Sequence, residues 1–413
     1  MVTLLLAIIY VAFISLGLPD SLLGSAWPQM HLDLGAQLSM QGIISMIISC
    51  GTVISSFFSE KLIYKLGTGK VTAISTLMTA IALFGFSVSG NFYMLCIIAI
   101  PYGLGAGAID AALNNYVAIN FASKHMSWLH CFWGIGAAVG PYIMGAAMSL
   151  GKGWRGGYFS ISIIQIILTV ILFAALPLWK INEDSGDSRR NEENTNYKPK
   201  TIKEILSIKG VFFVFTAFFC YSAIEQTTGL WASSYLVINR GLSSNTAAGF
   251  VGMFYIGITA GRFISGFIAD KLGDRKMIRI GICGILIGLV MLFIPVNYLS
   301  AGFKEIKMII PLIGLCIIGL GCAPIYPSII HATPDNFGKE NSQAIIGVQM
   351  AFAYLGVIAM PALFGVISQY ITIALFPLYI LTITLIMLIM SEKMNRLMRN
   401  QKKDLELTEK SNW

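Results

Sequence analysis

Runs of apolar residues recur along the whole chain, and short polar segments separate them. About 20 apolar residues in a helix are enough to cross ~30 Å of hydrocarbon. On this basis the pattern predicts twelve spans, at approximately residues 3–27, 37–59, 71–90, 92–121, 127–150, 157–179, 208–237, 246–269, 277–296, 307–331, 342–369 and 371–391. We therefore expect an all-α membrane protein with twelve transmembrane helices.

One long polar segment, residues 182–206, divides these spans into six and six. It includes the run Asn-Glu-Asp-Ser-Gly-Asp-Ser-Arg-Arg-Asn, which has too few apolar residues to bury a core, and we interpret it as a linker. The predicted domains are an N-terminal six-helix bundle at 1–181, the linker at 182–206, a C-terminal six-helix bundle at 207–391 and a tail at 392–413.

The two halves repeat short motifs in the same order. The matched pairs are Gly136-Ala-Ala-Val-Gly140-Pro141 with Gly356-Val-Ile-Ala-Met360-Pro361, Gly103-Leu-Gly105 with Gly319-Leu-Gly321, and Glu60-Lys61-Leu62 with Asp270-Lys271-Leu272. Three matches in register indicate duplication, which is typical of transporters that bind their solute between two bundles. We expect the glycines of the fifth and eleventh spans to permit close helix packing.

Composition and charge agree with a membrane protein. Hydrophobic residues make up 56% of the chain and charged residues 12%, whereas soluble proteins average about 25% charged. If both termini are cytoplasmic, the loops on the other side hold only Lys152, Arg155, Arg240, Lys304 and Lys307 of the 28 Lys and Arg. This asymmetry predicts a plasma-membrane protein with both termini and the linker in the cytoplasm. The bilayer accounts for the net charge of +8, so no nucleic-acid partner is expected.

Several classes of site are not indicated by the residue pattern. The seven cysteines fall inside apolar runs, and their spacing fits neither a metal site nor a disulfide framework. Since no nucleophile–base or metal-ligand pattern occurs either, we expect no enzyme activity, no cofactor and no metal. Trp27, Trp154 and Trp179 fall near span ends, where tryptophan commonly anchors a helix at the membrane interface.

A stripe of small and polar residues follows the span at 92–121. Gly103, Gly107, Asp110 and Asn114 recur at helical spacing and therefore share one face. A carboxylate in hydrocarbon costs a few kcal/mol, so Asp110 should face protein or water. We interpret it as a functional acid. The alternative is a neutral carboxylic acid that is hydrogen-bonded to a neighbouring helix.

Asp20 and Glu225 are two further acids inside predicted spans. On straight helices, Asp20 lies roughly 26 Å from the linker-side end of its span, and Asp110 lies roughly 27 Å from the opposite end of its own. The two acids are therefore offset toward opposite sides of the membrane. A buried acid can load a proton on one side and release it on the other, so Asp20, Asp110 and Glu225 are candidates for proton coupling. For Glu225, a neutral carboxyl bonded to a neighbour is the alternative.

The loop after the eighth span reads Gly266-Phe-Ile-Ala-Asp270-Lys271-Leu-Gly-Asp-Arg275-Lys276. It resembles the Gly-x-x-x-Asp-Arg/Lys-x-Gly-x-Arg-Arg/Lys motif of the major facilitator superfamily. The resemblance implies two pseudo-symmetric six-helix bundles. A basic cluster beside a helix-terminal Asp can bind neighbouring helix ends. The predicted gate residues are Gly266, Asp270, Lys271, Arg275 and Lys276.

Within that superfamily, the N-terminal half resembles the fucose–proton symporter family. The stretches that carry the resemblance are Gly17-Leu-Pro19-Asp20 with Pro28-Gln29 behind it, Asp110-Ala-Ala-Leu-Asn114, and Lys61-Leu-Ile-Tyr64-Lys65-Leu-Gly67. In that family two acidic residues are implicated in proton handling and sugar binding, and the resemblance implies these roles for Asp20 and Asp110. In the C-terminal half Gly261-Arg262-Phe263 recurs, but Glu225 places a carboxylate where an amide is expected.

A sugar site needs amides and carboxylates for hydroxyl groups and aromatic rings for the C–H face of the ring. The candidates for binding the substrate are Asn114, Asn115, Tyr116, His130, Gln226, Trp231, Gln349 and Tyr354. His130 also fits a histidine that serves only in packing.

The leading hypothesis is a monomeric secondary active transporter that carries a small polar solute, a sugar, together with protons across the bilayer by alternating access. Gly136-x-x-x-Gly140-Pro141-x-x-x-Gly145 partly resembles the motif of drug–proton antiporters. A drug or metabolite–proton antiporter is therefore one alternative. A sugar uniporter, in which the acids only accept hydrogen bonds, is another.

Overall fold

The computed structural model describes residues 2–121, 123–179, 202–294 and 304–411, and these residues form helices without a β-strand. The elements before the linker are α1 (Val2–Asp20), α2 (Leu22–Asp33), α3 (Met40–Leu66), α4 (Thr68–Val88), α5 (Phe92–Asn120), α6 (Ser123–Ser149) and α7 (Gly153–Ala174). Those after it are α9 (Ile202–Ser207), α10 (Val211–Ile238), α11 (Ser244–Leu272), α12 (Asp274–Phe293), α13 (Lys304–Cys322), α14 (Ile325–Phe337), α15 (Lys339–Ile367), η4 (Ser368–Thr372), η5 (Ile373–Leu375) and α16 (Phe376–Ser411).

Each predicted span falls on one helix or on consecutive helical segments, which confirms the all-α membrane fold. Among the described residues, ten segments are long and apolar enough to cross a membrane; one of them, Ile345–Gln401, contains most of both α15 and α16. A shorter apolar stretch, Met40–Ser56, lies in α3. Two spans are broken: α1 and α2 form the first, and α13 and α14 form the tenth, with Pro324 at the second break. Proline cannot donate the hydrogen bond that a continuous helix requires.

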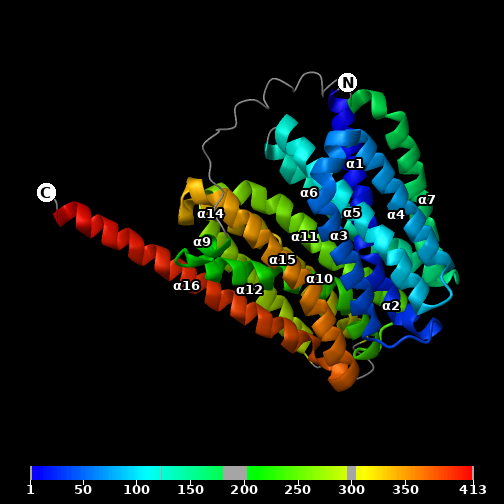
Figure 1. The fold of residues 1–413 in the computed structure, drawn as a ribbon. Coiled ribbons are helices and arrows are strands. Elements are labelled where there is room, and N and C mark those ends of the chain that lie inside the picture. The colour runs from blue at the N-terminus through cyan, green and yellow to red at the C-terminus, as the bar shows by residue number, and fades with distance from the viewer. Residues whose placement is uncertain (1, 122, 180–201, 295–303, 412–413) are drawn as a thin grey trace.

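The two halves have the same arrangement of helices (Figure 1). In the N-terminal half α1 packs on α6, and α3 packs on α5; in the C-terminal half α10 packs on α15, and α11 packs on α13. The halves meet where α6 crosses α11, α3 crosses α15 and α2 contacts α10. We call the end with the turns at residues 67 and 273 the linker end, and the end with residues 34–39 and 239–243 the far end.

Two equivalent turns at the linker end correct one predicted repeat. Gly67 ends α3 with φ 80° and ψ 154°, and Gly273 ends α11 with φ 75° and ψ 156°. Glycine adopts this positive φ without a steric penalty. Lys65-Leu66-Gly67 is therefore the counterpart of Lys271-Leu272-Gly273, and the predicted pairing with Glu60-Lys61-Leu62 was wrong by four residues, about one helical turn.

Glycines bring the paired helices into backbone contact, as expected for the fifth and eleventh spans. A Cβ on Gly136 of α6 would lie 2.0 Å from the carbonyl oxygen of Ile14, and one on Gly356 of α15 would lie 2.5 Å from that of Phe219. The stripe on α5 has the same function, because a Cβ on Gly103 would lie 2.3 Å from a carbonyl oxygen of α3. Such distances leave room only for hydrogen, so these helix pairs pack closely.

The three tryptophans near span ends are packed inside the protein, so their expected placement at the membrane interface was wrong. Trp27 and Trp154 are 0% exposed, and Trp179 is 2% exposed. The Nε1 of Trp154 donates to Asp33 at 2.8 Å, and that of Trp27 donates to a backbone carbonyl at 2.9 Å. A buried indole N–H usually has such an acceptor.

Candidate functional site

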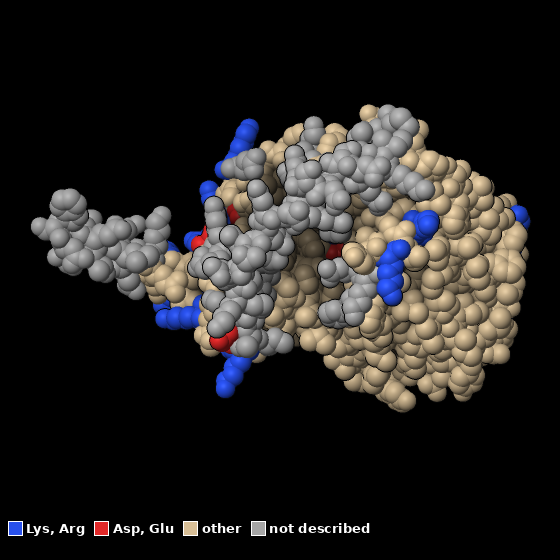
Figure 2. All heavy atoms as spheres, turned by 45° about the horizontal axis from the view of Figure 1, so that its top comes forward, with Lys and Arg blue, Asp and Glu red and all other residues tan. Residues whose placement is uncertain are grey.

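A cavity of about 1250 Å³ lies between the two halves. The N-terminal half contributes Asp20 and Asp110 to its lining, and the C-terminal half contributes Glu225 and Arg262. Gly273 and residues of α14 line its mouth, so the cavity reaches the linker end. Figure 2 looks obliquely onto this end and shows a hollow between the halves.

Backbone contacts close the far end. A Cβ on Gly24 of α2 would lie 2.3 Å from the carbonyl oxygen of Gly229 on α10. Gln41 of α3 donates to the carbonyl oxygen of Leu230 at 2.8 Å, which is a hydrogen bond between the two halves. The protein is thus in a conformation that is open toward the linker end and closed at the far end.

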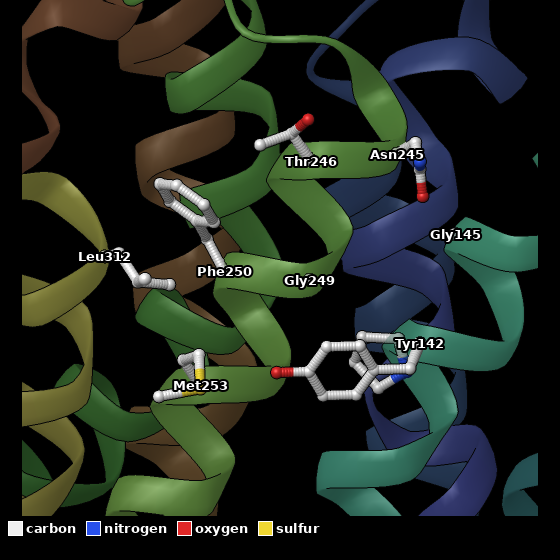
Figure 3. Close-up of a pocket in the computed structure, with 9 residues that line it drawn as sticks. Tyr142, Gly145, Asn245, Thr246, Gly249, Phe250, Met253 and Leu312 are labelled. Carbon is white, nitrogen blue, oxygen red and sulfur yellow. The ribbon is translucent and has the colours of Figure 1, made fainter. Parts of the chain in front are cut away.

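A second, smaller pocket of about 360 Å³ lies beside the crossing of α6 and α11 (Figure 3). Gly145 of α6 lies beside Asn245 of α11 there, and Phe250 of α11 lies on the side of Leu312 of α13. A Cβ on Gly145 would lie 2.6 Å from the side-chain oxygen of Asn245. The crossing therefore depends on a small residue at position 145.

Asp20 lies at the C-terminal end of α1 and is held by two donors from other helices of its half. Tyr102 of α5 donates to Oδ1 at 3.3 Å, and Trp133 of α6 donates from Nε1 to Oδ2 at 2.8 Å. No described cation forms an ion pair with it. Asp20 is thus an acid that is open to the cavity and oriented by neutral donors.

Asp110 lies eight residues beyond Tyr102 on α5 and also lines the cavity. Asn114 donates to its Oδ1 at 2.9 Å and to its carbonyl oxygen at 3.0 Å. No ion pair joins Asp110 to a described cation either. Eight residues of helix correspond to about 12 Å, so Asp110 lies well toward the linker end from the place where Tyr102 binds Asp20.

Glu225 of α10 has a different environment, because it forms an ion pair. Its Oε1 lies 3.4 Å from Nη2 of Arg262 on α11, and the hydroxyl of Tyr221 donates to its other oxygen. Both side chains of the ion pair are 17% exposed. The guanidinium of Arg262 also lies over the ring of Trp133, 5.4 Å from its centroid.

Arg262 is the only lysine or arginine among the described residues that line the cavity. The carboxylates that line it are Asp20, Asp110, Glu225, Asp274 and Asp335. Its tyrosines are Tyr102, Tyr158, Tyr221, Tyr255 and Tyr326. The surface that a solute meets is therefore acidic, aromatic and rich in hydroxyl groups.

The predicted substrate-binding residues fall into two groups. His130 and Gln226 line the cavity, and Asn114 orients Asp110. Tyr116, Trp231, Gln349 and Tyr354 are not part of the described lining, and the side chain of Asn115 lies outside the described residues. The Nε1 of Trp231 donates to the carbonyl oxygen of Pro361 at 2.9 Å, which holds Trp231 in the packing between α10 and α15.

The predicted gate residues lie around the Gly273 turn. Gly266 lines the cavity, Lys271, Arg275 and Lys276 are exposed, and the side chain of Asp270 lies outside the described residues. The acid that makes a described contact in this loop is Asp274, which lies 2.8 Å from Nδ1 of His331 on α14. This contact joins the start of α12 to α14 at the cavity mouth.

Sequence reasoning did not identify Arg262, Tyr102 and Trp133 as site residues. For Arg262 the signal was available, since a positive charge inside the predicted span at 246–269 is as costly as the acids that were noted. Tyr102 and Trp133 carry no such signal. They matter because α5 and α6 place them beside Asp20.

The family model of the Major Facilitator Superfamily matches residues 9–361. The glucose/mannose transporter GlcP of Bacillus subtilis is 26% identical over 285 residues, which cover 66% of this chain and 67% of that protein. Multidrug resistance protein 2 of the same organism is 24% identical over 376 residues, 88% of each chain. The solved structure of the nucleoside transporter NupG is similar in fold, with a TM-score of 0.74 at 13% identity, covering 94% of this chain and 98% of that one.

Proposed function

Because the chain belongs to the Major Facilitator Superfamily, and is thus a membrane transporter rather than an enzyme, we propose that it carries an uncharged sugar together with protons. The solute binds in the cavity between the halves, and the halves expose it alternately to the linker end and the far end. We propose that the protein lies in the plasma membrane with the linker and both termini in the cytoplasm, and that the monomer is the transporting unit.

The observation that carries the proton-coupling proposal is the contrast among the three acids. Glu225 is neutralised by Arg262, whereas Asp20 and Asp110 line the same cavity without a described cation partner. An unpaired carboxylate at membrane depth is costly, and such residues commonly mark proton relays. Asp20 and Asp110 are therefore the proposed proton-carrying acids, and Glu225 is proposed to hold Arg262 in place.

The lining also supports a sugar as the solute. Tyrosine hydroxyls, Gln226 and the acids supply hydrogen-bonding partners for hydroxyl groups, and the rings supply apolar faces. Because carboxylates outnumber basic groups on this lining, it favours an uncharged sugar over a sugar acid or a sugar phosphate. The similarity to a glucose/mannose transporter supports a sugar as the solute.

Uptake into proteoliposomes tests this proposal. Labelled hexoses, a hexuronate and a hexose phosphate are offered separately, with and without an imposed pH gradient. We expect accumulation of at least one neutral hexose that depends on the gradient, and little transport of the two anions. Transport of the anions alone would overturn the assignment of an uncharged solute.

A drug or metabolite–proton antiporter is the second candidate. It is favoured by the motif Gly136-x-x-x-Gly140-Pro141-x-x-x-Gly145 on α6 and by the similarity to a multidrug resistance protein over 88% of each chain. In that case a lipophilic cation would be transported in the same vesicles in the direction opposite to the proton flux, and no hexose would be transported.

A further inference from the structure

A continuous series of contacts joins Asp20 in the N-terminal half to Glu225 in the C-terminal half. Trp133 donates from Nε1 to Asp20 at 2.8 Å, and the face of its ring lies 5.4 Å from the guanidinium of Arg262. Arg262 in turn pairs with Glu225 at 3.4 Å. Trp133 is thus the side chain that contacts both the unpaired acid of one half and the ion pair of the other.

We propose that Trp133 is a positioning residue, which links the protonation of Asp20 to the strength of the Arg262–Glu225 pair. This inference rests on the proposed proton coupling. It assigns Trp133 a role in transmitting the proton's effect between the halves, in addition to lining the cavity.

The physical basis is that the indole has a donor edge and an electron-rich face. A negative acceptor at Nε1 polarises the N–H bond and adds electron density to the ring, and hydrogen-bonded groups polarise one another in this way. A richer ring attracts a guanidinium more strongly through cation–π interaction. While Asp20 is ionised, Trp133 therefore draws Arg262 toward the N-terminal half.

Protonation of Asp20 changes this balance. A proton from the water in the cavity forms an O–H bond on one carboxylate oxygen, and the acid becomes a weaker acceptor for the indole N–H. The ring then holds the guanidinium less strongly, and Arg262 pairs more closely with Glu225. Loading Asp20 thus loosens a contact between the halves, which is what reorientation of a loaded carrier requires.

Other polar groups surround this series of contacts and are part of the same environment. Tyr102 binds the second oxygen of Asp20, and Tyr255 of α11 lies edge-on to Trp133, 6.2 Å between ring centroids. The remaining titratable groups that line the cavity are Asp110, His130, Tyr158, Tyr221, Tyr326, Asp274, His331 and Asp335. Among the described side chains, only Trp133 donates a hydrogen bond to Asp20 and also contacts Arg262.

Intrinsic fluorescence of the purified protein tests the contact without any solute. Trp128→Phe serves as the parent variant, because Trp128 has a histidine neighbour of its own, the ring of His125, which lies edge-on to it at 5.4 Å. We expect a pH-dependent change of emission in the parent that disappears both with Asp20→Asn and with Trp133→Phe. A change that depends on Asp20 but persists in Trp133→Phe would overturn the proposal, as would the absence of any change that Asp20→Asn removes. Trp27, 6.1 Å from the ring of His31, supplies a background that is common to all the variants.

Transport tests the link itself. Trp133→Phe keeps an aromatic face for Arg262 but loses the N–H donor to Asp20. We expect accumulation driven by a pH gradient to fall about tenfold more than solute exchange. A tenfold change is about the size of effect that the loss of one hydrogen bond to a charged group produces. Trp128→Phe, on the same helix and away from the cavity lining, is the matched control.

The outcomes separate this inference from the proposed function. If accumulation and exchange fall in proportion, or neither falls, Trp133 does not transmit the effect of the proton. If the parent variant accumulates no sugar in response to pH, the proposed function fails, and the fluorescence result still decides whether Trp133 senses Asp20.

Discussion

The Arg262–Glu225 pair provides a quantitative test of the site, because removing Arg262 alone leaves a largely buried carboxylate unpaired. The pair is separated by 3.4 Å, and each side chain is 17% exposed. At that distance two unit charges attract by about 5 kcal/mol at an effective dielectric constant of 20. Breaking such a pair from one side costs about 3–5 kcal/mol. Arg262→Met should therefore lower the free energy of unfolding by an amount in that range.

The more specific part of this prediction is that a second substitution restores the lost stability. Adding Glu225→Gln to Arg262→Met removes the unpaired charge, so most of the lost stability should return. The remainder, about 0.5–2 kcal/mol, corresponds to the cation–π contact with Trp133. Denaturant unfolding in detergent, followed by tryptophan emission, measures all three variants.

The matched control is the exposed Arg279–Glu392 pair, whose side chains are 52% and 39% exposed and whose atoms lie 2.6 Å apart. Exposed pairs contribute about 0–1 kcal/mol, so Arg279→Met should have a small effect in spite of its shorter distance. The reasoning is refuted if Arg262→Met costs no more than Arg279→Met, or if Glu225→Gln fails to restore stability.

Two further predictions concern conformation and topology. Gly24→Ala puts a Cβ 2.3 Å from the carbonyl oxygen of Gly229 and should destabilise the closed far end by about 1–3 kcal/mol. A cysteine placed at Ser49, which lines the cavity, should then be alkylated faster by a reagent added from the far end. Gly90→Ala is the control, because a Cβ there would have nothing within 4 Å, and it should leave the rate of alkylation unchanged. If the linker is cytoplasmic, a single cysteine at Asn194 should resist impermeant thiol reagents in intact cells, and labelling from outside would reverse the assigned orientation.

The sequence was sufficient to predict the helices and the two acids. Apolar length alone places a membrane helix, because the bilayer requires about 20 such residues. An acid inside such a run is conspicuous because hydrocarbon penalises charge, so Asp20 and Asp110 were predicted and do line the cavity.

The neighbours of these acids could not be predicted in the same way. Helical periodicity gives the face on which a residue lies but not the helix that this face meets. Trp231 and Trp133 are both tryptophans in the middle of a helix, yet the first packs against Pro361 of α15 and the second binds Asp20. That difference arises from how α10 and α6 pack.

The loop after α11 shows a related limit. Its motif indicated a charged gate centred on Asp270, and the described contact is made by Asp274, which pairs with His331 of α14. No sequence pattern links His331 to this turn. His331 lies on α14, and the break between α13 and α14 in the tenth span sets the direction in which α14 runs.

The central claim is that Asp20 and Asp110 carry the coupling proton. Paired measurements of solute exchange and of uptake driven by a pH gradient, in the same vesicles, test it most directly. An asparagine resembles the protonated acid in size and hydrogen bonding but cannot cycle charge, so Asp110→Asn should lose concentrative uptake far more than exchange. Asp20→Asn should do the same if the proton is shared, and should lose binding if Asp20 mainly holds the solute. The account predicts no concentrative uptake in the double variant; concentrative uptake retained there would contradict it.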